Sequence, residues 1–580
     1  MDLEDLANEI ILEIFGYFST FDLLRSFYNL NIRFNHLVFA YFHTSGVDFS
    51  RISLQDFYLI CQEYLPAIAD HITSLRLTND DDTPQQADVF LQHGLTLRQL
   101  HQLRKLSLCD ICSNDIMHTM MSEWTSLRYL THLTLAGCYL TFDQSISQSL
   151  IDTIWSLPIL IYCYLNISFE ETSIVIPTVK SISLKYLFIW GFAYDQSQLN
   201  TIFQHTPCLE QCSMLFNMDI PDQSLVISQP LSSMTRLRIH SSHIEDDCLV
   251  KFLQIMPNLY QLIIDVDSLD LHSTNPILNG YQWETIIRFY LPHLRIFRLR
   301  IEFSFPDQND LDKQVDNLLK SFRSSFWLEE HKWFVRCHWN QWNTACIYTL
   351  PYKFVDLKFD SSMKYKSTCP NDNHYLSYNH VEDLQYKILP IQSPMVSSIR
   401  FMNVDHLSIE FPMDMHSLPN MPRLDQVTSL EVCIINNYLA QSKLQTLLNQ
   451  MHRLSSFSFH PCSLSLLGSS FFKLTHTRIC RLDFRIFFQY FDDEQCTNLC
   501  DSPLGKQCEF LSIKIKKRKS LPDLINNMIN LRTLNIQFED DQFEQEDDDE
   551  LVHWLRNHLP STCLIGRDTA LNKDIRIWVR

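Results

Sequence analysis

Cysteine and histidine are the residues of this chain whose spacing comes closest to chemistry. Cys109 and Cys112 form a Cys-x-x-Cys pair with His118 nearby, which is half of a zinc site or a redox pair. No second pair of this spacing follows, and Cys109 stands directly after the apolar pattern of a strand. The spacing therefore favours buried thiols over metal binding or redox chemistry.

A larger group of cysteines and histidines lies toward the C-terminus. Its cysteines lack the paired Cys-x-x-Cys spacing that structural zinc sites use. We expect no metal site there, and zinc coordination is the alternative. The group comprises His460, Cys462, His476, Cys480, Cys496, Cys500 and Cys508.

Glycine is rare, with nine residues in a chain of 580, against a usual share of about 7%. Phosphate-binding loops need several glycines within one turn, and the hydrolase nucleophile elbow needs a glycine on each side of its serine. Neither motif occurs, His-Glu-x-x-His is absent, and carboxylates and histidines are too dispersed for a catalytic pair or triad. We expect a protein that is not an enzyme and binds no cofactor.

The charge balance favours a protein as the partner. The chain has 47 Lys and Arg against 67 Asp and Glu, a formal net charge of −20, which disfavours nucleic acid and anionic membranes. Residues 1 to 5 are acidic, unlike a secretory signal, and no run of about eighteen apolar residues occurs. Its 18 cysteines are scattered without a disulfide framework. We therefore expect a cytoplasmic and/or nuclear protein.

An apolar triplet spaced Leu-x-x-Leu-x-Leu recurs about every 26 residues through much of the chain. Alternation within the triplet predicts a strand with one buried face. The copies begin at Ile72, Leu103, Leu130, Leu160, Leu184, Leu209, Met234, Leu259, Leu294, Phe354, Val404, Val427, Leu454, Ile479, Cys508 and Leu531.

Helices are predicted between the triplets. Leu249, Phe252, Leu253 and Met256 recur at helical spacing, and Pro257 ends that helix before the next triplet. Such strand and helix units cannot bury their apolar sides alone, so they must stack. The pattern predicts an α/β solenoid, with a curved parallel sheet and outer helices. Similar helical stripes cover residues 199 to 206 and 444 to 451.

A unit of this length and pattern resembles the leucine-rich repeat in its long, helix-containing form. Cys138 and Cys462 stand at the family's Asn/Cys position, where we expect their thiols to bond buried backbone. The resemblance implies an exposed concave sheet that binds proteins. It covers residues 71 to 306 as a first block and 401 to 580 as a second block with a C-terminal cap, in which Ile575, Ile577 and Val579 predict an edge or capping strand.

Residues 307 to 400 lose the repeat phase and hold four of the ten tryptophans. We interpret them as an irregular aromatic-rich segment or as degenerate repeats, with the rings in the core. An aromatic recognition patch on the concave face is the alternative. The tryptophans are Trp327, Trp333, Trp339 and Trp342.

The N-terminal residues 1 to 45 lie outside the repeats and predict three short helices, followed by a helical linker or cap over 46 to 70. About 40 residues make too small a core to be stable alone. This module must therefore dock on a partner, on the solenoid, or on both.

The module resembles the F-box motif. The family pattern Leu-Pro-x-Glu, then Ile-Phe, then Asp-Leu-Leu, then an aromatic after a basic residue is matched at residues 6 to 9, 14 to 15, 22 to 24 and 33 to 34. Ala7 replaces the usual Pro, Phe34 replaces the commoner Trp, and about one extra residue separates Asp22 from Phe34.

The resemblance implies a substrate-recognition subunit of a Skp-cullin-F-box type E3 ubiquitin ligase. Its partners would be the ligase adaptor, the cullin scaffold and an unknown protein substrate on the concave face. The alternative is a leucine-rich-repeat scaffold without a ligase, in which the helices only cap the first repeat. The residues expected to bind the adaptor are Leu6, Ile10, Ile11, Ile14, Phe15, Leu23 and Leu24, with Glu9 at the rim.

Overall fold

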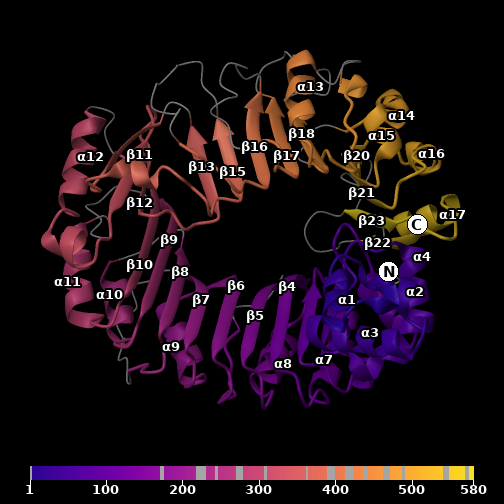
Figure 1. Ribbon diagram of the computed structural model, residues 1–580, viewed down its shortest axis with the longest axis horizontal. Helices are drawn as coiled ribbons and strands as arrows, with labels where there is room; N and C mark the ends of the chain where they lie inside the picture. The colour runs from indigo at the N-terminus through magenta and orange to yellow at the C-terminus, as the bar shows by residue number, and fades with distance from the viewer. Residues whose placement is uncertain are drawn as a thin grey trace.

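In the computed structural model, the chain forms a ring of stacked strands with helices on its outer side, and the two termini lie side by side (Figure 1). None of the helices in the described residues combines the length and the apolar character needed to cross a membrane. The structure describes residues 3–169, 175–216, 230–241, 246–269, 279–305, 310–360, 363–387, 399–411, 423–434, 441–461, 471–485, 490–539, 548–567 and 574–579.

Within the described residues, a first sheet of thirteen strands has the order β1 to β10 followed by β12, β11 and β14. The first ten strands pair in parallel and in chain order. They are Val47–Asp48 (β1), Ser74–Thr78 (β2), Lys105–Cys109 (β3), His132–Leu140 (β4), Tyr162–Phe169 (β5), Tyr186–Tyr194 (β6), Gln211–Phe216 (β7), Arg236–Ser241 (β8), Gln261–Leu269 (β9) and Ile296–Ser304 (β10).

The second sheet has ten strands in the described part of the chain, and neither sheet closes there into a barrel. Its strands are parallel from β13 to β21, and two antiparallel strands complete it. They are Asp356–Asp360 (β13), Asp383–Lys387 (β15), His406–Phe411 (β16), Ser429–Ile434 (β17), Ser456–Pro461 (β18), Arg481–Asp483 (β19), Phe510–Ile515 (β20), Thr533–Phe538 (β21), Ile575–Trp578 (β23) and Leu564–Arg567 (β22).

Helices connect many of the strands on the outer side. Several begin at an acidic or hydroxyl cap: the Asp143 carboxylate accepts the Ile146 backbone N–H at 2.8 Å. The helices predicted from the stripes are present as α9, α10 and α13. The outer helices are Gln86–Gln92 (α6), Asn114–Trp124 (α7), Gln144–Trp155 (α8), Gln196–Gln204 (α9), Asp246–Gln254 (α10), Gly280–Tyr290 (α11), Leu311–Lys320 (α12), Gln441–Gln450 (α13), Asp493–Asp501 (α14), Pro503–Gln507 (α15), Leu521–Asn527 (α16) and Asp548–His558 (α17).

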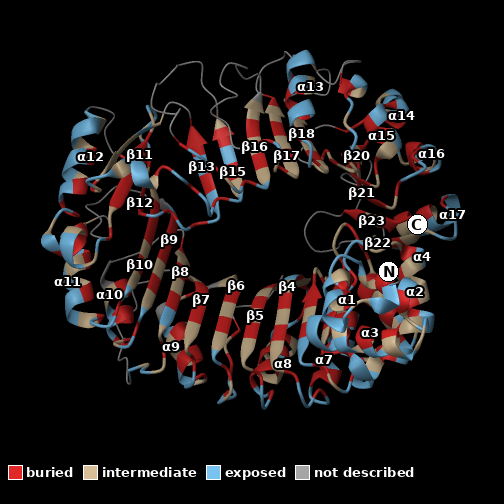
Figure 2. Cartoon of the chain, in the orientation of Figure 1, coloured by how far each residue is buried: buried red, intermediate tan, exposed pale blue. Residues whose placement is uncertain are grey.

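The apolar triplets form the core between the sheets and the helices. Leu237 of β8 lies beside Leu262 of β9 in register, and both are buried. Buried and partly exposed residues alternate along the strands, as Figure 2 shows. The mixed α/β, solenoid-like fold expected from the repeats is therefore confirmed.

The two sheets meet at three antiparallel strands, Val335–Trp339 (β11), Thr344–Thr349 (β12) and Lys364–Ser367 (β14). Trp327, Trp333 and Trp339 are buried here, whereas Trp342 is exposed. The second block of parallel strands begins at β13, at Asp356, and not at the boundary expected at residue 401. β13 pairs with β15 and β15 pairs with β16 in parallel, so both strands belong to the second sheet.

The N-terminal module consists of Asn8–Phe15 (α1), Thr20–Phe27 (α2) and Ile32–Ser45 (α3). Aromatic rings fill its centre, with the centroids of Phe15 and Phe27 4.8 Å apart. The segment 46 to 70 contains the helices Leu54–Leu59 (α4) and Leu65–Ile68 (α5), and it also supplies β1, the edge strand of the first sheet. The module is thus continuous with the solenoid.

Contacts between the N-terminal part of the first sheet and the C-terminal part of the second sheet close the ring. Trp578 of β23 is fully buried and packs in the core cluster of the first sheet, 6.1 Å from the Phe57 ring. Arg485 bonds Asp81 at 2.9 Å, and the Gln85 amide donates to the Ile565 carbonyl at 2.7 Å. β23 lies between β21 and β22, so it is not an edge strand as the sequence predicted. Its alternating apolar residues are buried where the C-terminal strands pack against the N-terminal part of the chain.

Candidate functional site

The eight residues predicted to contact a partner divide by exposure into two sets. Four of them are fully buried within the module, so they hold its helices together and present no surface to a partner. Leu6 and Ile14 are half-buried, and Glu9 and Ile10 are exposed. The buried residues are Ile11, Phe15, Leu23 and Leu24.

Further large apolar side chains of the module are exposed, as Ile10 is. Ile32 is 77% exposed and Tyr17 is 85% exposed. Sequence reasoning missed them because it looked for apolar residues that match the motif. Their positions in the sequence could have indicated that they are exposed. Tyr17 follows Gly16 at the end of α1, and Ile32 stands between the polar residues Asn31 and Arg33 at the start of α3. The whole set, here called the module patch, is Leu3, Ile10, Tyr17, Phe18, Leu30 and Ile32.

Hydrogen bonds join the two parts of the chain that carry the module patch. The Arg33 Nε donates to the Asn8 Oδ1 at 3.0 Å, and the Asn31 amide donates to the Glu4 carboxylate at 2.8 Å. Arg33 also donates to the backbone carbonyls of Glu4 and Leu6. These bonds bring the N-terminal turn against the start of α3, so that Leu3 and Ile32 lie at the same end of the module.

A second candidate site lies on the inner face of the first sheet. A hollow of about 380 Å³ extends from β5 to β9 and is lined on one side by aromatic rings and on the other by guanidinium groups. We call it the inner hollow. Most of its residues occupy the positions between the triplet apolar residues. Alternation therefore predicts the direction of these side chains but not which of them become neighbours. Its lining includes Tyr162, Tyr164, Phe188, Trp190, Ser213, Arg236 and Arg238.

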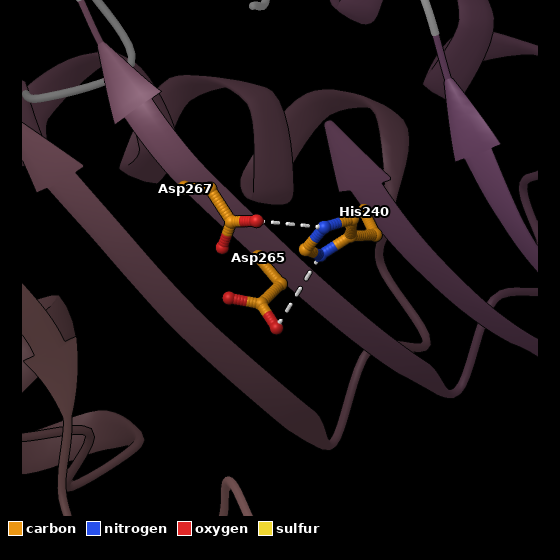
Figure 3. Close-up of side chains that lie close together, drawn as sticks. All are labelled: His240, Asp265 and Asp267. Carbon is orange, nitrogen blue, oxygen red and sulfur yellow. Dashed lines mark ion pairs between the residues drawn. The ribbon is translucent and has the colours of Figure 1, made fainter. Parts of the chain in front are cut away.

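Next to the inner hollow, His240, Asp265 and Asp267 form a charged group (Figure 3). His240 Nε2 lies 3.0 Å from Asp267 and Nδ1 lies 3.7 Å from Asp265. The hydrogen bond to Asp265 raises the pKa of His240, and burial opposes it. Burial would raise the pKa of Asp265, but hydrogen bonds from His240 and Arg300 outweigh it and lower that pKa.

In the described residues this is the one group of three or more such side chains close enough to hold a metal ion. Arg300 donates to both oxygens of Asp265, at 2.6 and 2.9 Å, and Arg238 lies 3.7 Å from it. Two guanidinium groups beside the carboxylate already balance its charge and repel a cation. The geometry is that of an ion-pair network.

The predicted cysteine and histidine groups lie apart from this network. Cys109 is buried, and the Cys138 thiol bonds the Leu108 carbonyl at 3.7 Å, as expected for a thiol that caps backbone. His460 faces Glu431 at 3.3 Å, and His476 bonds the Met451 carbonyl at 3.0 Å. Cys462 lies outside the described residues.

A larger hollow of about 850 Å³ lies on the outer side between α14 and α16. Its wall includes the basic run around Lys517, but Asp493 bonds Lys517 at 3.2 Å and Ser520 at 2.6 Å. Asp523 also lines it. Three basic side chains and two carboxylates line this hollow, so it carries only a small net positive charge, and one of the basic groups is already paired.

No protein-family model matches the sequence, and no curated protein is detectably similar to it.

Proposed function

We propose that the protein is the substrate-recognition subunit of a Skp-cullin-F-box type E3 ubiquitin ligase. In this proposal the N-terminal helices are an F-box that binds the ligase adaptor, and the solenoid consists of leucine-rich repeats that bind a protein substrate. The chain itself is not catalytic and acts in the cytoplasm and/or the nucleus. The ligase chemistry takes place on other subunits.

The main support is the concentration of exposed apolar side chains in the module patch. Among the described residues, six of the sixteen large apolar side chains that are exposed lie between Leu3 and Ile32. So many exposed apolar side chains in so short a segment favour a protein interaction site. Because the patch coincides with the part of the chain that resembles the F-box, the adaptor is its proposed occupant.

The burial of the motif residues refines which side chains would touch the adaptor. Ile11, Phe15, Leu23 and Leu24 set the angles between the three helices, while the module patch, with Leu6, Ile14 and Glu9 beside it, forms the contact. Burying an apolar side chain of this size is worth about 1.5 to 3 kcal/mol before the costs of association. A few such anchors are sufficient for a stable complex.

Co-purification with a Skp-type adaptor tests the proposal. Ile32→Asp places a charge in the module patch and is expected to lower recovery of the adaptor at least tenfold. Phe289→Asp is the matched control, because Phe289 on α11 is 75% exposed against 77% for Ile32. It should retain the adaptor. Retention by both folded variants, or no recovery with the wild-type chain, would contradict the proposal.

A scaffold without a ligase is the second candidate. It is supported by the contact between the module and the solenoid: the Thr73 hydroxyl of the first repeat donates to the His43 carbonyl of α3 at 2.7 Å, and β1 pairs with β2. Helices that cap a solenoid make such contacts. A folded wild-type chain that never retains the adaptor would favour this candidate.

A further inference from the structure

We propose that the inner hollow binds a phosphotyrosine side chain presented by a partner protein. The inference deepens the receptor role proposed above by naming its substrate class. Its test uses the full chain without adaptor, so that failure of peptide binding and failure of adaptor binding are separate results.

The inner hollow exists because a small residue stands in a row of large ones. Along one row of the sheet, Phe188 of β6, Ser213 of β7 and Arg238 of β8 are neighbours in register. Adjacent strands lie about 4.8 Å apart, so that Phe188 and Arg238 stand roughly 10 Å apart across the serine. The side chains on either side cover Ser213, which is 2% exposed, and the hollow lies above this low point of the row.

The wall on the β5 and β6 side is aromatic. The ring centroids of Tyr162 and Phe188 lie 5.2 Å apart, and those of Tyr164 and Phe188 lie 6.4 Å apart. Trp190 continues this wall in the next row. Rings prefer offset or edge contacts with further rings, and so this wall favours a ligand with an aromatic stem.

Two polar groups of the inner hollow have no hydrogen-bond partner in the described structure. They are the Ser213 hydroxyl, on a residue that is 2% exposed, and the Arg238 Nε. A buried donor without a partner is costly, and native proteins generally supply one. Both residues line the hollow, but neighbouring side chains cover these two atoms, so an acceptor on a ligand satisfies them only when those side chains move aside.

The opposite wall carries positive charge that is balanced only in part, because Arg238 shares the Asp265 carboxylate with Arg300. The Arg238 guanidinium packs 5.8 Å from the Trp190 ring, and its nearest carboxylate, Asp265, is already bound by Arg300. Arg236 forms no ion pair within the described residues. Guanidinium forks match phosphate oxygens in pairs, which makes this wall suited to a phosphate.

An aromatic stem and a phosphate together define the ligand. A phosphoserine would reach the arginines but leave the aromatic wall uncovered, and an unmodified tyrosine would offer the arginines no anion. Nucleic acid also combines rings with phosphates. The net charge of −20 repels a polyanion such as nucleic acid. A single phosphate interacts mainly with the arginines next to it.

Fluorescence anisotropy with labelled peptides tests the proposal. One peptide sequence of glycine and serine around a central tyrosine is prepared with phosphotyrosine, tyrosine or phosphoserine, and a single-stranded RNA serves as a fourth probe. The phosphotyrosine peptide is expected to bind at least tenfold more tightly than the other three. Equal affinity for the tyrosine or phosphoserine peptide, or tighter binding of the RNA, would overturn the proposal.

Matched variants locate the site. Arg238→Ala removes the guanidinium and Ser213→Phe fills the inner hollow, and each should weaken phosphotyrosine binding at least tenfold. Arg295→Ala, at an exposed arginine, and Ser408→Phe, at an inner-face serine of the second sheet, should leave it unchanged. Circular dichroism checks that each variant is folded. Unchanged binding by folded Arg238→Ala, or equal losses in the controls, would also overturn the proposal.

Discussion

The inner faces of the two sheets have the same strand geometry but differ in where their charged side chains find partners. On the second sheet, Glu431 accepts from His406 at 3.5 Å and His460 at 3.3 Å. Lys387 and Glu410 also pair there, at 2.9 Å. On the first sheet, Arg238 shares Asp265 with Arg300, and Arg236 has no ion pair in the described residues, although both arginines lie beside a wall of rings.

This difference separates structural charge from charge available to a ligand. A pair that is satisfied within the protein has little to gain from a partner, whereas an unpaired guanidinium gains a full set of hydrogen bonds. The solenoid backbone alone therefore does not decide where recognition occurs. The side chains between the triplet residues decide it, and the first sheet is the part that is poised to bind.

The largest expected effect breaks the ion-pair network of the first sheet. Asp265 and Arg300 have side chains that are 2% and 5% exposed, so Asp265→Ala leaves a buried guanidinium without its main partner. We expect the free energy of unfolding to fall by about 3 to 5 kcal/mol. Glu431→Ala on the second sheet, at a more exposed pair, should cost less than about 1 kcal/mol. Urea unfolding of both variants measures the difference, and equal losses would remove the contrast.

A second prediction contrasts the pH dependence of two histidines. Burial, and then the charge of Arg336, lowers the pKa of His338 on β11 to about 3. The unfolded chain takes up a proton near pH 6.5 that folded His338 cannot accept, so stability falls as the pH drops from about 6.5 toward 3. At pH 5 this loss amounts to about 2 kcal/mol.

His406 on the second sheet has the opposite sign. Its hydrogen bond to Glu431 raises its pKa, with burial opposing, so that its contribution is present at low pH and is lost as the pH rises through the raised value. Unfolding of His338→Gln and His406→Gln at pH 5 and pH 8 checks both signs. In His338→Gln, the free energy of unfolding should fall less between pH 8 and pH 5 than it does in the wild-type chain. His406→Gln should lower the free energy of unfolding more at pH 5 than at pH 8. The same pH profile for both variants would refute this assignment.

The smallest effect concerns the charges that close the ring. Arg485→Gln removes the ion pair with Asp81, which joins the second sheet to the first repeat. Because Arg485 is partly exposed, the cost is expected to be about 1 kcal/mol or less and to shrink in high salt. Arg423→Gln, which breaks an exposed pair with Asp425 in the turn before β17, should have no measurable effect. Thermal unfolding at two salt concentrations distinguishes them, and a salt-independent loss would argue against an electrostatic closure.

Periodicity was sufficient to predict the solenoid. Whether a triplet residue such as Leu237 or Ile264 is buried depends only on its place in the alternation of its own strand. It could not predict ring closure, since Trp578 and Phe57 meet only after every intervening repeat has stacked. The inner hollow could not be predicted from the sequence for a related reason. Only the register of the strands places the small Ser213 between the large Phe188 and Arg238. Motif matching likewise marked Phe15 and Leu24 as contacts, although small modules need such residues for their own core.

The central claim is that one chain holds an adaptor at its N-terminal helices and a phosphorylated ligand on its first sheet. Size-exclusion chromatography with light scattering tests it directly, using the full chain, a Skp-type adaptor and a labelled phosphotyrosine peptide. The account predicts co-elution of all three at one copy each. Elution of the adaptor apart from a folded chain would contradict it.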